Sequence, residues 1–209
     1  MPFITDTTMP ITVSNQEDSI ALLFKKGFER AADSFSRMIR YPVSSNHTKT
    51  VVQSDRENHF SSAKGNLEFC VLTTQLIGQL PGKSYLVLSA EACQSIYNVS
   101  FPGRDVNKEL QEGQLLELDN IISASVISEL ANALKVELYG DVPQLKRMSA
   151  DQLTSYLKMD YLTQDQVKIN IISSTTFTLT GKEPVQVQFI WKLSSEILES
   201  IAERVKTIL

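Results

Sequence analysis

The chain has 209 residues, of which 42% are apolar and 21% are charged, a balance typical of a globular protein with a sizeable core. Its net charge of −4 and its lack of Lys/Arg clusters argue against a nucleic-acid partner. Residues 1–13 contain no basic segment followed by an apolar run, and no apolar stretch approaches the roughly 20 residues of a membrane span. We therefore expect a cytoplasmic protein without a membrane partner.

The cysteines and histidines do not form a recognisable metal or catalytic pattern. Cys70 and Cys93 lie inside apolar runs without CxxC spacing, and His47 and His59 lie in polar segments. We expect the cysteines to be buried small side chains and the histidines to be surface residues. We therefore predict neither a zinc site nor a Cys/His catalytic pair, and we expect no metal-binding residues on this chain.

The first predicted element is a long amphipathic helix over residues 16–40. Ser14 is expected to cap it, because Glu17 three residues later completes a capping box, and Pro42 is expected to stop it. Its apolar face consists of Ile20, Phe24, Phe28, Ala31, Phe35 and Met38.

Three strands and a short helix are predicted next. Polar and apolar side chains alternate weakly over residues 48–53, and residues 67–76 are rich in apolar and β-branched side chains. Residues 85–88 form a short apolar run after a Pro81-Gly82 turn. A short helix is expected over 90–99. A polar segment then leads to Gly113, where the second long helix is predicted to begin.

The second long helix is predicted over residues 113–136. One face is apolar and should pack on the core; it carries Leu115, Ile122, Val126, Leu130 and Ala133. The opposite face should be exposed and carries a carboxylate and a carboxamide one turn apart among small residues: Glu117, Asn120, Ala124, Ser128 and Ala131. A partner could approach such a face closely.

The pair Glu117 and Asn120 has limited chemistry. The amide of Asn120 both accepts and donates hydrogen bonds without titrating, which suits it to orienting a water molecule, whereas ionised Glu117 can only accept. The plainer alternative is a solvated helix face, since Glu129 and Asn132 repeat the same spacing in the same helix.

The remaining elements repeat the order of the first half. A strand is predicted over 136–139 and past Pro143, a short helix over 150–157, strands over 167–179 and 185–193 separated by a Gly181-Lys turn, and a closing helix over 194–209. We therefore predict one α+β domain with half-repeats at about 14–104 and 107–209, after an N-terminal extension at 1–13. Its two long helices should cover one face of a mostly antiparallel sheet.

The segment LLELDNIISASVISELANAL is similar to the signature helix of the CheC/CheX/FliY family of chemotaxis phosphatases, and LIGQLPGKSYLVLSAEA resembles the family's hairpin and short helix. The resemblance implies a CheC-like pseudo-twofold fold. It also implies an activity, the dephosphorylation of a phosphorylated CheY-like response regulator.

The resemblance assigns roles to individual residues. Asn120 matches the Asn that enters the regulator's active site and positions the hydrolytic water, and Glu117 matches the Glu that pairs with the regulator's Lys; Ala124 and Ser128 extend the partner-binding face. Gly113 and Asp119 depart from the family pattern. No cofactor is implied on this chain, because the regulator supplies a divalent ion such as Mg²⁺.

The first helix has Leu22 and Lys25 where a second Glu and Asn would fall, so the resemblance implies one active site, as in CheX.

A competing hypothesis is that the chain is a non-catalytic adaptor, at the flagellar switch or with a CheD-like protein. In that case Gly113 and Asp119 would be signs of lost activity. A third is an unrelated α+β protein with an accidental motif. The family includes monomers and dimers, so a homodimer is also among the expected assemblies.

Overall fold

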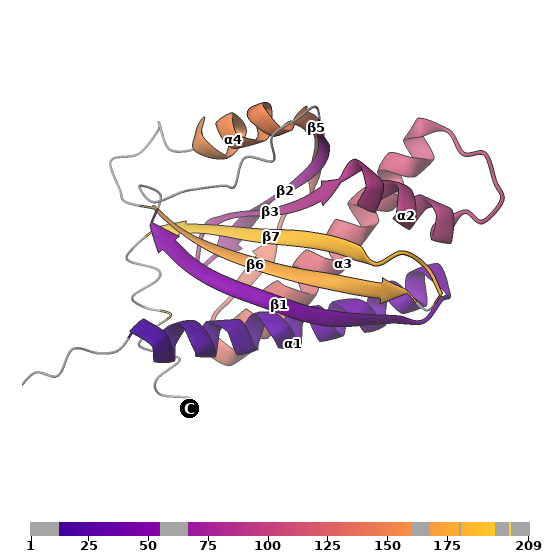
Figure 1. The fold of residues 1–209 in the computed structure, drawn as a ribbon. Coiled ribbons are helices and arrows are strands. Elements are labelled where there is room, and N and C mark those ends of the chain that lie inside the picture. The colour runs from indigo at the N-terminus through magenta and orange to yellow at the C-terminus, as the bar shows by residue number, and fades with distance from the viewer. Residues whose placement is uncertain (1–12, 55–66, 160–167, 180, 195–200, 202–209) are drawn as a thin grey trace, which may run out of the picture.

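The computed structural model describes residues 13–54, 67–159, 168–179, 181–194 and 201 (Figure 1). The elements follow in the order α1 (Val13–Ile39), β1 (Val43–Ser54), β2 (Glu68–Gly78), β3 (Gly82–Ser89), α2 (Ala90–Ser100), α3 (Lys108–Leu134), β4 (Leu138–Gly140), β5 (Gln144–Ser149), α4 (Ala150–Met159), β6 (Lys168–Leu179) and β7 (Val185–Ser194).

The seven strands form one sheet to which both halves of the chain contribute. The strand order is β1-β6-β7-β3-β2-β4, and β5 pairs with β2 beside β4. Each strand pair is antiparallel. The β6–β7 hairpin of the second half lies between β1 and β3 of the first, so the predicted α+β class with an antiparallel sheet is confirmed.

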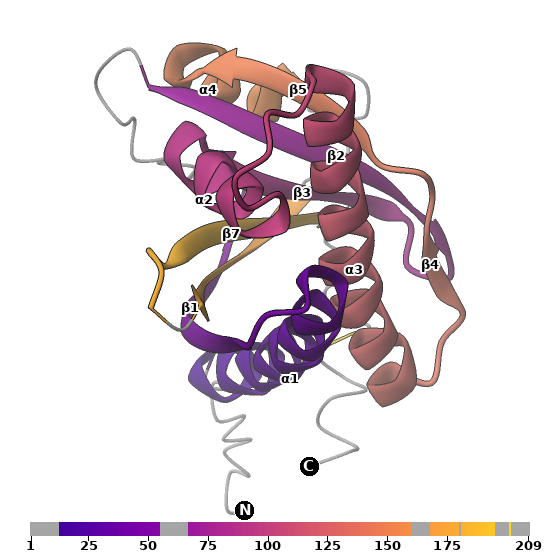
Figure 2. The ribbon, with the colours of Figure 1, turned by 90° about the vertical axis from the view of Figure 1, so that its right-hand side faces the viewer.

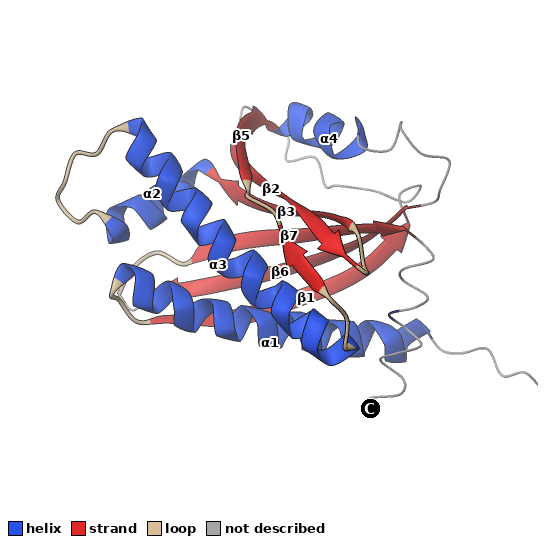
Figure 3. Ribbon diagram, turned by 180° about the vertical axis from the view of Figure 1, so that it is seen from behind, coloured by secondary structure: helices blue, strands red, loops and turns tan. Residues whose placement is uncertain are grey.

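The helices cover both faces of this sheet. The long helices α1 and α3 lie on the same face, as Figures 2 and 3 show, and α2 packs on that face beside the first half of α3. The shorter α4 covers part of the opposite face, where Leu157 packs against Val71, Tyr85 and Ile190. Successive residues of β2 alternate between these layers: Cys70 and Leu72 face the long helices, and Val71 faces α4.

Several element boundaries differ from those predicted. The helix α3 begins at Lys108, because the side chain of Asn107 accepts a hydrogen bond from the backbone N–H of Leu110 at 2.9 Å and caps it there. Gly113 therefore lies inside the helix. The helix α1 already includes Val13, ahead of the predicted cap at Ser14, and it ends at Ile39 because Arg40 adopts a left-handed conformation with φ 53°.

The strand predictions differ from the structure at three places. The first strand starts at Val43, five positions before the predicted 48, and the strand predicted over 85–88 extends over Gly82–Ser89. The segment predicted as one strand around Pro143 forms two, β4 and β5. Of the closing helix predicted over 194–209, only Ser194 and Ile201 lie within the described residues, so that helix stays a prediction.

The contact between the two long helices depends on Gly27. A Cβ atom added there would lie 2.7 Å from the Cα atom of Val126, closer than carbon atoms normally approach. We expect Gly27→Ala to lower the free energy of unfolding by about 1–3 kcal/mol, since overpacking at this crossing outweighs the helix propensity of Ala. The measurement is urea unfolding followed by circular dichroism.

Gly113→Ala is the matched control, because a Cβ atom at that exposed helical position meets no atom within 4 Å. It should raise the free energy of unfolding by roughly 0.5–1 kcal/mol. Equal effects of the two substitutions would show that α1 and α3 do not pack as closely as described.

Candidate functional site

Helix α3 presents the predicted pair on its outer face. Glu117, Asn120, Ala124 and Ser128 are all exposed, whereas Leu115 is fully buried beneath them. The helical phase deduced from spacing is therefore confirmed. Within the described part of the chain, the side chains of Glu117 and Asn120 have no hydrogen-bond or ion-pair partner, so both are available to a partner protein. Their roles stay predictions.

Asp119, the residue beside Asn120, points the opposite way. It is 1% exposed, and its carboxylate accepts hydrogen bonds from Thr74 Oγ1 of β2 at 2.8 Å and from Ser123 Oγ at 2.9 Å. Burial raises the pKa of Asp119 to about 6, although the two hydroxyl donors oppose the shift. This departure from the family pattern has a structural explanation: Asp119 ties α3 to the sheet beneath the exposed pair.

The second Glu-x-x-Asn instance lies in a different environment. Glu129 is 9% exposed and forms an ion pair with Arg30 of α1, and Asn132, one turn further on, is exposed. Glu129 is thus engaged within the fold, whereas Glu117 is not. Of the two Glu-x-x-Asn patterns on α3, one therefore has its Glu side chain held in an ion pair within the fold, and the other has a Glu side chain that is free to contact a partner.

The exposed face of α3 continues onto α1 in a hollow that the sequence did not predict. Beyond Asn120, residues of both long helices line an open hollow of about 400 Å³: Arg30, Asp33, Ser34 and Arg37 of α1 with Ala124, Ser125 and Ser128 of α3. Arg37 donates a hydrogen bond to Ser34 Oγ at 3.2 Å. The hollow adds charged side chains and a hydroxyl group of α1 to a surface that was predicted from α3 alone.

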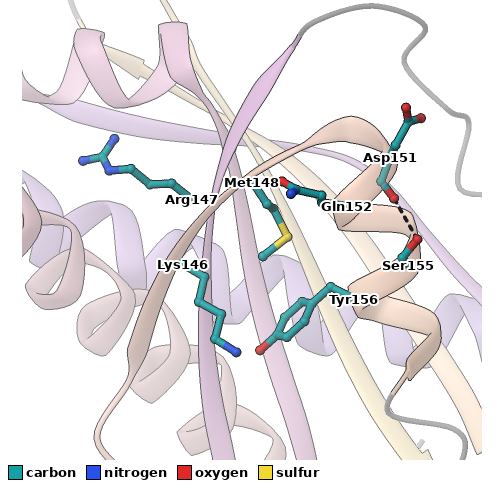
Figure 4. A pocket seen from close by; sticks show the side chains of 7 residues that line it. All are labelled: Lys146, Arg147, Met148, Asp151, Gln152, Ser155 and Tyr156. Atoms are coloured by element: carbon teal, nitrogen blue, oxygen red, sulfur yellow. Dashed lines mark hydrogen bonds between the residues drawn. The ribbon is translucent and has the colours of Figure 1, made fainter.

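A second open hollow, of about 580 Å³, lies between β5 and α4 (Figure 4). There the ammonium group of Lys146 lies 4.5 Å from the centre of the Tyr156 ring, and Ser155 Oγ donates to the backbone oxygen of Asp151 at 3.0 Å. Because α4 covers the other face of the sheet, this hollow is separate from the Asn120 surface.

Three solved structures resemble the whole arrangement. FliY from Thermotoga maritima superposes with a TM-score of 0.73 at 13% identity, covering 96% of this chain and 100% of that one. The FliM middle domain from Vibrio alginolyticus gives a TM-score of 0.59 at 13% identity, covering 90% of this chain and 99% of that one. The chain has the fold of the CheC/CheX/FliY family.

The FliG–FliM complex from H. pylori also contains a similar chain, with a TM-score of 0.62 at 14% identity over 92% of this chain and 100% of that one. No protein-family model and no curated protein matches the sequence. Likeness at these identities concerns the fold, so the activity has to be argued from the side chains.

Within the CheC/CheX/FliY fold, the equivalent face of the first helix differs as predicted. Leu22 is 43% exposed and Lys25 is exposed, so α1 presents an apolar and a basic side chain where α3 presents Glu117 and Asn120. The exposed Glu/Asn pair occurs once on the two long helices.

Two expectations for the cysteines and histidines were incomplete. Cys70 and Cys93 are buried as predicted, but Cys70 also accepts a hydrogen bond from Arg147 Nη1 at 3.4 Å. His47 is half-buried in β1 rather than on the surface: its Nε2 lies 2.8 Å from Thr50 Oγ1, and its ring stacks on that of Phe28. His59 lies outside the described residues.

No group of three or more His, Cys, Asp or Glu side chains in the described ranges is arranged to hold a metal ion. None of the helices there is both long and apolar enough to cross a membrane.

Proposed function

We propose that this chain is a chemotaxis phosphatase that accelerates dephosphorylation of a CheY-like response regulator. The observation that carries the proposal is the exposed, unpartnered Glu117 and Asn120 on α3, in a chain with the fold of that family. Asp119 no longer argues for lost activity, because its side chain is directed to the sheet and leaves the outer face unobstructed.

The proposed mechanism divides the catalytic groups between two proteins. The aspartyl phosphate of a regulator lies beside a divalent ion and a Lys of that regulator, which neutralise most of the charge of the transition state. The contribution of this chain is to position the attacking water. The carboxamide of Asn120 enters the regulator's site and holds the attacking water in line with the phosphorus atom, an entropic contribution that can reach several kcal/mol.

Glu117 is the docking residue in this proposal. Its carboxylate lies one turn from Asn120 and pairs with the regulator's Lys, which fixes the direction in which the amide enters. Ala124 and Ser128 have small side chains, so the partner's backbone can approach α3, and the charged residues of the hollow extend the same face.

The direct test measures the lifetime of the phosphoryl group on a purified CheY-like regulator in Mg²⁺ buffer, with and without excess wild-type chain. We expect a shortened lifetime. A regulator that binds the chain in its phosphorylated form and keeps its phosphoryl group for the same time would contradict the phosphatase proposal.

Glu117→Lys should weaken association with the phosphorylated regulator on the order of tenfold, because it replaces an attractive charge pair with a repulsive one. Glu117→Ala should have a smaller effect of the same sign. Fluorescence titration of the regulator measures both. Glu137→Lys is the matched control, since it makes the same charge change at an exposed residue beyond the end of α3; equal weakening by both Lys variants would argue for non-specific electrostatics.

The adaptor alternative is favoured by one observation, the similarity to FliM chains, one of them in a complex with FliG. An adaptor would bind a flagellar-switch component or a CheD-like protein through the same surfaces. It would bind without accelerating phosphate release, and substitution of Asn120 would have no effect on any rate.

A further inference from the structure

The hollow between α1 and α3 begins directly beside Asn120. Ala124 and Ser128, which line it, follow Asn120 at steps of four residues, so the three side chains lie along one line of the helix. At a rise of about 1.5 Å per residue, these two residues stand about 6 Å and about 12 Å from Asn120 along the axis of α3. A typical protein interface covers about 800 Å² on each partner. A partner that receives Asn120 therefore also covers the hollow.

The α1 side of this surface is basic, although the whole chain has a net charge of −4. Between residues 22 and 40, the exposed anions are Glu29 and Asp33, and the exposed cations are Lys25, Lys26, Arg30, Arg37 and Arg40. The exposed face of α3 carries the carboxylate of Glu117 beside Asn120. The two long helices thus present opposite charges to a partner that lies across them.

The charged residues of the hollow differ in how they are compensated. Arg30 forms an ion pair with Glu129, whereas neither Asp33 nor Arg37 forms an ion pair with any residue that the structure describes. Arg37 Nη2 donates a hydrogen bond to Ser34 Oγ at 3.2 Å. A guanidinium has five N–H donors, so Arg37 keeps donors for a ligand, and its charge is not neutralised by an ion pair.

Hydroxyl groups add to these donors. Ser34 accepts from Arg37, so its own O–H group can still donate, and the hydroxyl of Ser128 has no hydrogen bond to any described residue. The hydroxyl of Ser125 is already used, because it donates to the backbone oxygen of Ile121 at 2.7 Å. Asp33 is the single anion in the lining, against two guanidinium groups. This excess of donors suits a carboxylate, which accepts through both oxygens and pairs with Arg in a two-point geometry.

We infer that the hollow receives an acidic side chain of the phosphorylated regulator, held by Arg37 with the hydroxyls of Ser34 and Ser128. The identity of the partner rests on the proposed function. The regulator surface that receives Asn120 is anionic, because the aspartyl phosphate and the carboxylates that hold the divalent ion gather there. Glu117 then pairs with a cation of the regulator and Arg37 with an anion, and two opposite charge pairs fix one docking direction.

The test measures binding without hydrolysis. A purified CheY-like regulator is held in its phosphorylated form with beryllofluoride and Mg²⁺, which it cannot hydrolyse, and is titrated with the full-length chain. Arg37→Glu should weaken binding about tenfold and Arg37→Gln about threefold, with Arg37→Lys between Arg37→Gln and the wild type. The affinity of Arg37→Gln should also fall less steeply with NaCl than that of the wild type, because one charge pair is missing.

Lys158→Glu is the matched control, because it makes the same charge change at an exposed residue of α4, on the opposite face of the sheet. It should change the affinity by less than about twofold. Binding that is unchanged by Arg37→Glu, or weakened equally by Lys158→Glu, would overturn the inference.

Parallel phosphate-release measurements separate this inference from the phosphatase proposal. A wild-type chain that binds through Arg37 but does not accelerate release would remove the proposed activity and leave the docking role of Arg37. Accelerated release together with unchanged binding by Arg37→Glu would remove the docking role and leave the activity.

Discussion

Asn120→Ala is expected to remove most of the stimulated dephosphorylation, a loss on the order of 100-fold in the stimulated rate. The amide is the only group of this chain that the mechanism places on the attacking water. Truncation to Ala removes it while deleting little contact area, so the affinity for the phosphorylated regulator should change by less than about threefold. Paired measurements of phosphate release and of regulator binding separate the two effects.

Asn132→Ala provides the matched control for this prediction. Asn132 is exposed on the same helix and also stands three residues after a Glu, but that Glu is paired with Arg30. The control variant should dephosphorylate the regulator as fast as the wild type. Neither substitution should alter thermal stability much, since both side chains are on the surface.

Asp119→Asn is expected to stabilise the protein at neutral pH by up to about 3 kcal/mol. In the native state burial raises the pKa of this carboxyl from 3.8 to about 6. The native state therefore binds the Asp119 proton more tightly than the unfolded state does. The stabilisation from protonated Asp119 is present below the unfolded pKa and is lost as the pH rises through the native pKa, which is the reverse of the usual behaviour of an ion-paired Asp.

The measurement is urea unfolding of the wild type and of Asp119→Asn between about pH 4 and about pH 7.5. The stability difference between the two should be small at the acid end and grow in favour of Asn up to about pH 6, then stay level. A difference that does not change with pH would show that the Asp119 carboxyl is not desolvated as described. Because Asn can donate to the Thr74 and Ser123 hydroxyls, the exposed face should be preserved and phosphatase activity retained.

The exposed pair was predictable because it depends on local geometry. The apolar residues of α3 recur with helical spacing, and once Leu115 and Val126 are assigned to the core, the helix places Glu117 and Asn120 on the opposite side. The sheet class was predictable for a similar reason, since turn residues between short β-branched runs favour hairpins and hence antiparallel pairs. The predicted start of α3 at Gly113 is wrong because the capping side chain of Asn107 decides where the helix begins, and the helix continues through the glycine.

The remaining features depend on contacts between distant segments. Whether Glu129 or Glu117 is free is decided by Arg30 on another helix, and the partner of buried Asp119 comes from β2. The spacing of residues in one sequence contains no information about these contacts, so the α1 side of the hollow, from Arg30 to Arg37, could not be predicted.

Catalytic turnover is the most direct test of the central claim that this chain is a phosphatase. Phosphorylated CheY-like regulator would be mixed in Mg²⁺ buffer with wild-type chain at a small fraction of the regulator's concentration, and released phosphate would be followed to completion. The account predicts that the entire regulator pool loses its phosphoryl groups much faster than it does alone, with many regulators processed by each chain. Release that stays at the regulator's own rate, or an acceleration limited to one regulator per chain, would contradict it.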